Sequence, residues 1–130
     1  MRTLEFEWQG QTLHLCLNGA ALFDIYDKFG TKGSITDHIN GTGKKSFSAT
    51  CWMLAKLAEQ GELVRRYQGH DRGEIPTEQM LQVMLRPSDV AAAKVAIRYA
   101  VVLGFKRDED PEDQEIDVGL LELQKKTAVT

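Results

Sequence analysis

The chain has 130 residues, of which 42% are hydrophobic and 27% are charged, with a formal net charge of −3. This length suits one domain, and the composition is ordinary for a globular protein that folds without disulfides or a metal. No run approaches the ~18 consecutive apolar residues of a membrane-spanning helix, and the first residues alternate in polarity, unlike a signal peptide. Cys16 and Cys51 stand in no metal-ligand spacing and are expected to be buried free thiols. We therefore expect a cytoplasmic protein with no membrane partner.

The charge is distributed unevenly along the chain. Seven of the 19 acidic residues lie between Asp108 and Asp117, so that the rest of the chain carries more positive than negative charge. A segment of this charge density cannot bury enough apolar surface to offset the entropy lost on ordering. We therefore expect a domain of hairpin and helices over residues 1–105, followed by an acidic, flexible C-terminal tail over residues 106–130.

Two segments near the N-terminus alternate between apolar and polar residues. Residues 3–8 and 12–17 both show the period of two that a half-buried strand requires. Between them, Gln9-Gly10-Gln11 supplies a glycine for a tight turn. A hairpin alone is marginally stable in water, so its apolar face is expected to be covered by helices.

The remaining segments up to residue 105 show helical spacing. Asn18 is a candidate N-cap for a helix that ends at Gly30, and a short helical turn is expected over residues 34–39. The most apolar helix is expected from Phe47 to about Gln60, and Gly61 either ends it or is absorbed into it. The predicted fold is α+β but mostly α, with an N-terminal β-hairpin packed on a small bundle of about four to five helices.

Two further helices are expected after a polar turn at residues 69–73. The first begins at Pro76 and ends at Leu85, with four residues facing inward, namely Met80, Leu81, Met84 and Leu85. The second runs from Val90 to about Leu103, where Lys94 and Arg98 are expected to mark its single exposed strip.

No group of residues has the spacing of a known catalytic or cofactor-binding motif. The glycine-rich residues 41–46 lack the first glycine and the hydroxyl residue of a phosphate-binding loop, and no strand is expected before them. The three histidines lie in separate elements, and Cys51 lies within an apolar helix, where desolvation disfavours the thiolate. We therefore expect no enzyme activity, no metal and no cofactor.

Protein binding and nucleic-acid binding remain as alternatives. The last helix offers few outward polar side chains to read base edges, which disfavours DNA binding, although a small DNA-binding regulator stays the second hypothesis. Two helices are apolar on more than one side, so that either the domain covers them or a partner or a second copy does. Charged tails are usually solvated spacers, but this one could carry a docking peptide. The candidate partner-binding residues are Trp52, Leu120, Leu121 and Leu123.

The order of these parts resembles a known family. An alternating strand, a turn at Gly10 and a second strand lead into residues 17–30, a helix that ends in the aromatic-glycine pair Phe29-Gly30. An apolar line at residues 51–57, a late helix and a charged C-terminus follow. Over roughly residues 4–105 this pattern resembles the tail assembly chaperones of long-tailed bacteriophages and prophages, to which gene-transfer-agent chaperones are related.

The resemblance implies a partner but no site residues. Proteins of this family bind the long tape measure protein and help to recruit tail tube subunits around it. The resemblance therefore implies a small chaperone in the cytoplasm of a bacterial host cell, with the tape measure protein and the tail tube protein as partners, and it leaves self-association open. An apolar helical surface on such a protein could shield a long helical partner, and an acidic tail would keep the complex soluble.

Overall fold

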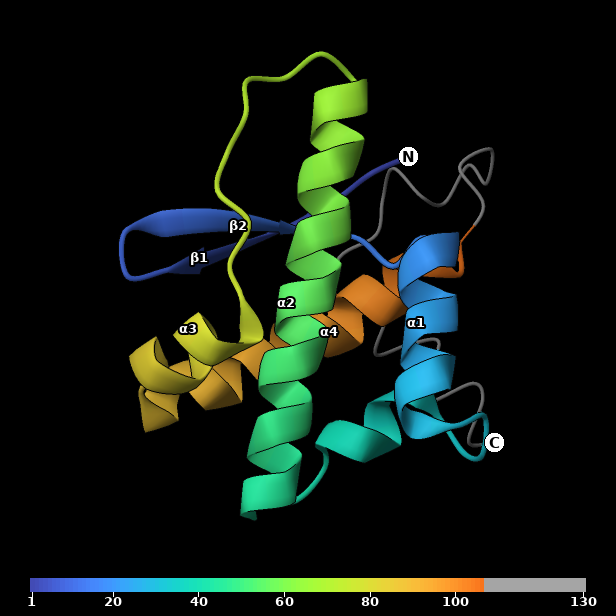
Figure 1. The fold of residues 1–130 in the computed structure, drawn as a ribbon, viewed down its shortest axis with the longest axis vertical. Helices are drawn as coiled ribbons and strands as arrows, with labels where there is room; N and C mark the ends of the chain where they lie inside the picture. The colour runs from blue at the N-terminus through green and yellow to red at the C-terminus, as the bar shows by residue number, and fades with distance from the viewer. Residues whose placement is uncertain (107–130) are drawn as a thin grey trace, which may run out of the picture.

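A computed structural model describes residues 1–106 and shows an antiparallel hairpin packed on four α-helices and one short 3-10 helix (Figure 1). In chain order the elements are β1 (Leu4–Trp8), β2 (Gln11–Leu15), α1 (Gly19–Phe29), η1 (Ile35–Ile39), α2 (Lys44–Tyr67), α3 (Glu78–Met84) and α4 (Pro87–Gly104). The predicted fold class, a mostly helical α+β fold with an N-terminal hairpin, is confirmed. Beyond Lys106, the predicted tail lies outside the described residues.

The hairpin closes through a two-residue turn. Gln9 and Gly10 both have positive φ angles, 48° and 78°, and Gln11 already pairs with Trp8 across the two strands. Two successive residues of positive φ match the right-handed twist of the strands, which favours this turn in a tight hairpin. The predicted turn at Gly10 is therefore confirmed, although the second strand begins one residue earlier than predicted and both strands are shorter.

Helix α2 is the central element of the fold. It begins at Lys44, three residues before the predicted start, and continues through Gly61 to Tyr67. A Cβ atom at Gly61 would overlap the carbonyl oxygen of His14, so the glycine lets α2 lie directly against the backbone of β2. Gly61 is thus absorbed into the helix because the strand leaves room for no side chain there.

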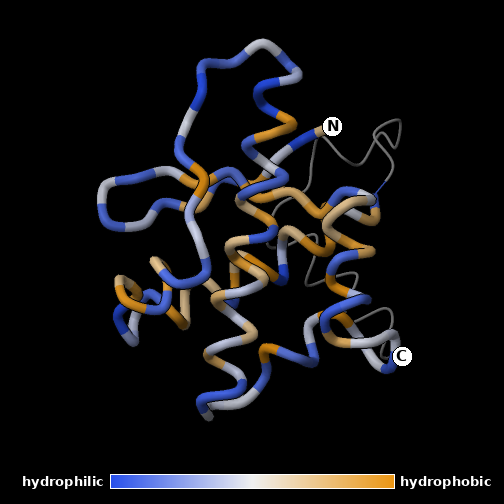
Figure 2. Tube along the Cα trace, in the orientation of Figure 1, coloured by the Kyte–Doolittle hydropathy of each residue, from blue (hydrophilic) through white to orange (hydrophobic). Residues whose placement is uncertain are grey.

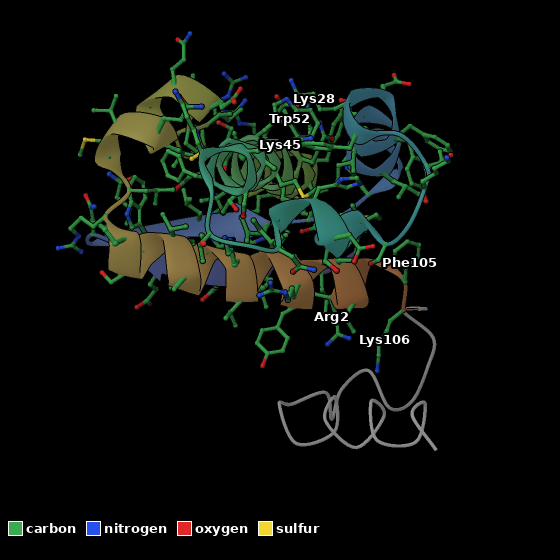
Figure 3. All side chains as sticks on the ribbon, turned by 90° about the horizontal axis from the view of Figure 1, so that it is seen from below. Arg2, Lys28, Lys45, Trp52, Phe105 and Lys106 are labelled. Carbon is green, nitrogen blue, oxygen red and sulfur yellow. The ribbon has the colours of Figure 1, made fainter. Side chains whose placement is uncertain are left out.

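The elements form two layers around α2. Helices α1 and α3 lie on opposite sides of α2, while the hairpin and α4 pass beneath it, with α2 packed on β2 and α4 on β1 (Figures 1 and 3). The apolar residues gather where these layers meet (Figure 2). The largest fully buried side chains are Leu15, Ile25, Ile39, Met53, Leu54, Leu57, Leu81 and Ile97. Among the helices described, none combines the length and the apolarity needed to cross a membrane.

Candidate protein-binding surface

Helix α3 buries only one of its two apolar faces. Leu81 and Leu85 are buried, but Met80, Val83 and Met84 are exposed. The relative solvent-accessible area of Val83 is 82%. These three residues stand at i, i+3 and i+4, so they share one face of the helix. The prediction that Met80 and Met84 face inward is wrong, because a helix of seven residues at the edge of the domain packs along one line only. Apolar residues on α3 accordingly reach the edge of the molecule in Figure 2.

An apolar groove begins where α3 ends. It has a volume of about 590 Å³ and lies between the start of α2 and the start of α4. Its apolar lining consists of Phe47, Leu85, Pro87, Val90 and Ala91, and its polar lining of Thr42, Gly43 and Lys94. A groove of this character is the kind of site that receives the apolar face of an amphipathic helix.

The hairpin holds the α3–α4 junction in place. The Trp8 Nε1–H donates to Asp89 Oδ2 at 3.2 Å, and the Gln9 side-chain amide donates to the same oxygen and to the Met84 carbonyl. Asp89 also caps α4 by accepting from the backbone N–H and the side chain of Arg86, which lowers the pKa of Asp89 well below its usual range. These contacts fix the entry into α4, and with it one wall of the groove.

The other wall is fixed by Lys94. Its ammonium donates to the carbonyl oxygen of Gly41 at 2.7 Å and to Ser46 Oγ at 3.0 Å, so the loop before α2 is tied to α4. Arg98, one turn further along α4, donates to Asn40 Oδ1 at 2.9 Å. Both side chains therefore turn sideways onto the loop and are only partly exposed.

The exposed strip of α4 is apolar, which corrects the prediction that Lys94 and Arg98 form it. Ala91, Ala92 and Val95 are exposed, with 48% of Val95 accessible, and Tyr99 continues the strip as a half-buried residue. The two cations lie beside this strip because hydrogen bonds to the loop hold them there. The apolar face of α3 (Met80, Val83, Met84), the groove and this strip are together termed the α3–α4 surface.

Trp52 lies away from the α3–α4 surface. Figure 3 shows it on the side of α2 that faces away from α4. Its ring packs edge-to-face against Phe29 at 5.4 Å between centroids, and Lys56 Nζ lies 5.9 Å from the ring centre. Trp52 lies on α2, is half-buried, and packs against the end of α1 through Phe29. The other predicted partner-binding residues, Leu120, Leu121 and Leu123, lie outside the described residues.

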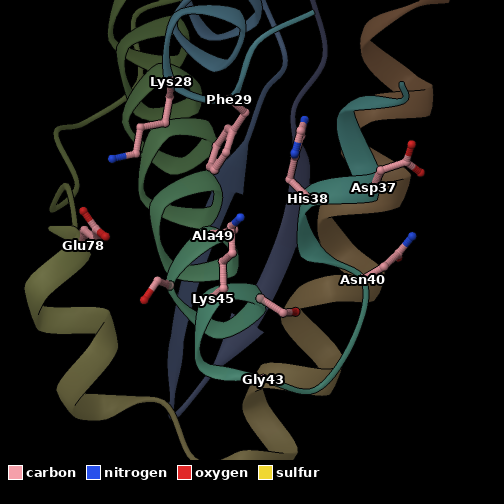
Figure 4. Close-up of a pocket in the computed structure, with 11 residues that line it drawn as sticks. Lys28, Phe29, Asp37, His38, Asn40, Gly43, Lys45, Ala49 and Glu78 are labelled. Atoms are coloured by element: carbon pink, nitrogen blue, oxygen red, sulfur yellow. The ribbon is translucent and has the colours of Figure 1, made fainter. Parts of the chain in front are cut away.

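A second pocket, of about 550 Å³, is lined in part by Phe29, the residue that packs against Trp52 (Figure 4). His38 stacks on Phe29 at its wall, with ring centroids 4.8 Å apart, and Lys28 and Lys45 stand at its edge. Gly43 caps α2 here, but the 3-10 helix η1 precedes the glycine-rich loop where a phosphate-binding loop would follow a strand. The pocket therefore offers isolated cations and no phosphate cradle.

The described residues offer little for nucleophilic or metal chemistry. Burial, with a smaller contribution from Glu78, raises the pKa of Cys51 to about 11, so its thiol stays protonated at neutral pH. Both cysteines are buried, as predicted. Within residues 1–106, no three His, Cys, Asp or Glu side chains lie close enough together to hold a metal ion.

Sequence reasoning missed the α3–α4 surface, although a signal for it was present. Residues 80–85 contain five apolar residues with a single polar one at Gln82, which is more apolar surface than one contact line of a short helix can bury. If the two faces of that helix are considered separately, the sequence predicts that Met80, Val83 and Met84 lie on a face that no other element buries. Comparison of the chain with protein-family models, with curated proteins and with solved structures found no match.

Proposed function

We propose that this chain is a tail assembly chaperone, which binds the tape measure protein of its phage or prophage and helps to recruit tail tube subunits. The observation that carries the proposal is the α3–α4 surface, an apolar area that the described part of the domain leaves uncovered. Uncovered apolar surface of this kind marks interaction sites in soluble proteins. The order of elements, which resembles that of the tail assembly chaperones, supplies the identity of the partner.

The chemistry of the surface suits a long helical partner. Met80 and Met84 are unbranched and polarisable, so they adapt to many apolar shapes, as the Met-rich surfaces of promiscuous binding proteins do. The adjoining groove is lined mainly by apolar side chains and can accept a helix that presents residues at i, i+3 and i+4. A chaperone for a protein that exposes apolar helices along its whole length needs such tolerance more than it needs sequence specificity.

The second hypothesis, a prophage-encoded DNA-binding regulator, draws less support from the same surface. The exposed residues Ala91, Ala92 and Val95 on the first half of α4 offer no hydrogen-bonding side chains to base edges. The Lys and Arg residues beside it bind neutral oxygens of the protein itself. Protein binding is therefore the better-supported function.

Co-expression tests the proposal. The tape measure protein made alone is expected to precipitate, and made together with this chain it is expected to stay soluble and to co-purify with it. Binding driven by apolar burial should change little between low and moderate salt, whereas a phosphate-binding protein loses orders of magnitude in affinity. A tape measure protein that is equally soluble without this chain, with no complex formed, would contradict the proposal and favour the regulator.

A further inference from the structure

The segment that joins α2 to α3 contains neither helix nor strand. It leaves α2 after Tyr67 and reaches α3 at Glu78, as the long arch at the top of Figure 1. Residues 69–74 are exposed, and residues 69–75 are termed the strap. A segment with few buried contacts opens at a lower free energy than the domain as a whole.

Three side chains of α2 hold the strap. Glu62 accepts a hydrogen bond from the Gly73 N–H at 2.6 Å, and Arg66 donates to the Gly73 carbonyl oxygen at 3.1 Å. Arg65 donates to the Asp71 carbonyl oxygen at 3.4 Å. Both arginines also pair with Glu62, so this one carboxylate orients the other two side chains and binds the strap itself.

The two ends of the strap differ in mobility. Gly69 has a φ angle of 89°, and a glycine can change its backbone angles widely at little steric cost, which suits a hinge. At the other end, Pro76 is buried, and Thr77 caps α3 by accepting from the Met80 N–H at 3.1 Å. The strap can therefore move between Gly69 and Pro76 while α2 and α3 stay in place.

The strap closes a cavity of about 290 Å³ between β2 and α2. One wall belongs to β2, with Leu13 and His14, and a second belongs to α2, with Ala58 and Glu62. The third wall is formed by residues 71–74 of the strap. It is the wall that no helix or strand supports, so movement of the strap controls access to this cavity.

We propose that the strap opens as a unit while the hairpin and the helices stay folded, that Glu62 is its latch, and that opening gives access to the cavity between β2 and α2. Opening breaks the three contacts to the strap backbone but leaves Glu62 paired with Arg65 and Arg66. No buried charge loses its partner, which keeps the free energy of opening low.

Hydrogen exchange of the full chain, followed by NMR in increasing urea below the unfolding transition, tests the proposal. No partner is needed, so the result does not depend on the proposed chaperone function. The Gly73 amide reports on the strap, and the amides of Leu54 and Leu57 report on the core of α2. After correction for intrinsic rates, Gly73 is expected to exchange at least about tenfold faster than the core amides. Its rate should hardly change with urea, because local opening exposes little surface, whereas the core rates should rise.

Two variants separate the latch from the core. Glu62→Gln is expected to speed the exchange of Gly73 about tenfold or more, because an uncharged acceptor holds the N–H more weakly. Ile97→Val, a small deletion at a fully buried residue of α4, should speed the core amides and leave Gly73 unchanged.

Three results would overturn the proposal. A Gly73 rate that rises with urea in parallel with the core amides would show that the strap leaves α2 only when the whole domain unfolds. This wild-type measurement requires no variant to fold. Equal acceleration of Gly73 and the core in I97V would show the same, and a Gly73 rate that E62Q leaves unchanged would show that Glu62 is not the latch.

Discussion

Glu62 is a charged residue at a position that a core residue would normally occupy. It is only 4% exposed, yet its carboxylate accepts from the Gly73 N–H at 2.6 Å and from the guanidinium groups of Arg65 and Arg66. Burial alone would raise the pKa of Glu62, but these donors outweigh it and the pKa is lowered. Glu62 therefore fastens the irregular segment after α2 against the hairpin side of that helix.

Glu62→Gln is expected to destabilise the domain by about 1–3 kcal/mol, because the amide cannot satisfy both guanidinium groups and the Gly73 N–H. Urea unfolding at neutral pH measures this change. Glu59→Gln is the matched control, since Glu59 lies on the same helix, is far more exposed and, among residues 1–106, pairs only with Lys56 and Gln60. Equal effects of the two substitutions would show that the Glu62 cluster contributes no special stability.

The pH dependence of stability should change in the same variant. A carboxyl group whose pKa is lowered by folding stabilises the native state above its unfolded pKa, about 4.3, and this contribution is lost as the pH falls through the folded value. Below about pH 4.3 the wild type should therefore lose stability more steeply than E62Q. Parallel acid unfolding curves for the two proteins would contradict the assignment.

Substitution by alanine is expected to have opposite effects on stability at two glycines. Gly61→Ala is expected to cost about 3 kcal/mol or more, because its Cβ would meet the backbone of His14, which cannot move without disturbing β2. Gly19→Ala, in the first turn of α1 with open space around it, is expected to be neutral or to stabilise by up to about 1 kcal/mol. Chemical unfolding of both variants checks the difference, and a tolerated alanine at residue 61 would mean that α2 does not lie against the strand.

At the scale of elements, hydrophobic periodicity predicted which segments fold but not which faces stay uncovered. The hairpin, the cap at Asn18 and the central helix follow from local pattern, because alternation, capping and apolar runs act within a few residues. The start of α2 at Lys44 was missed because a glycine-rich loop gives no apolar signal. The orientation of Lys94 depends on Gly41, 53 residues away, which no local pattern contains.

The central position of α2 carries a prediction of its own. Leu54 is fully buried near the middle of this helix, so Leu54→Ala should cost about 2–5 kcal/mol through the cavity that it leaves. Thermal or chemical unfolding measures the loss. A cost below about 1 kcal/mol would place that face of α2 outside the core.

For the whole molecule, the apolar excess of two helices left open whether the domain covers them or a partner does, and the structure leaves apolar residues exposed on α3 and α4. Trp52, a candidate partner-binding residue, is half-buried against Phe29 and lies outside these exposed residues. The difference arises because burial depends on where α1 and α3 lie against α2, which is a property of the tertiary fold. The sequence therefore indicated that apolar surface could be exposed, but it did not indicate which helices would expose it.

Co-purification of the tape measure protein with matched surface variants of this chain tests the central claim most directly. Val83→Asp places a charge in the exposed apolar face of α3, and Phe23→Asp places the same charge on α1, at another exposed apolar residue outside the α3–α4 surface. Both positions face solvent, so both variants are expected to fold with the stability of the wild type. If the α3–α4 surface binds the tape measure protein, V83D should lose the co-purified complex and F23D should retain it. Retention by V83D with loss by F23D would contradict the account and move the binding surface to α1.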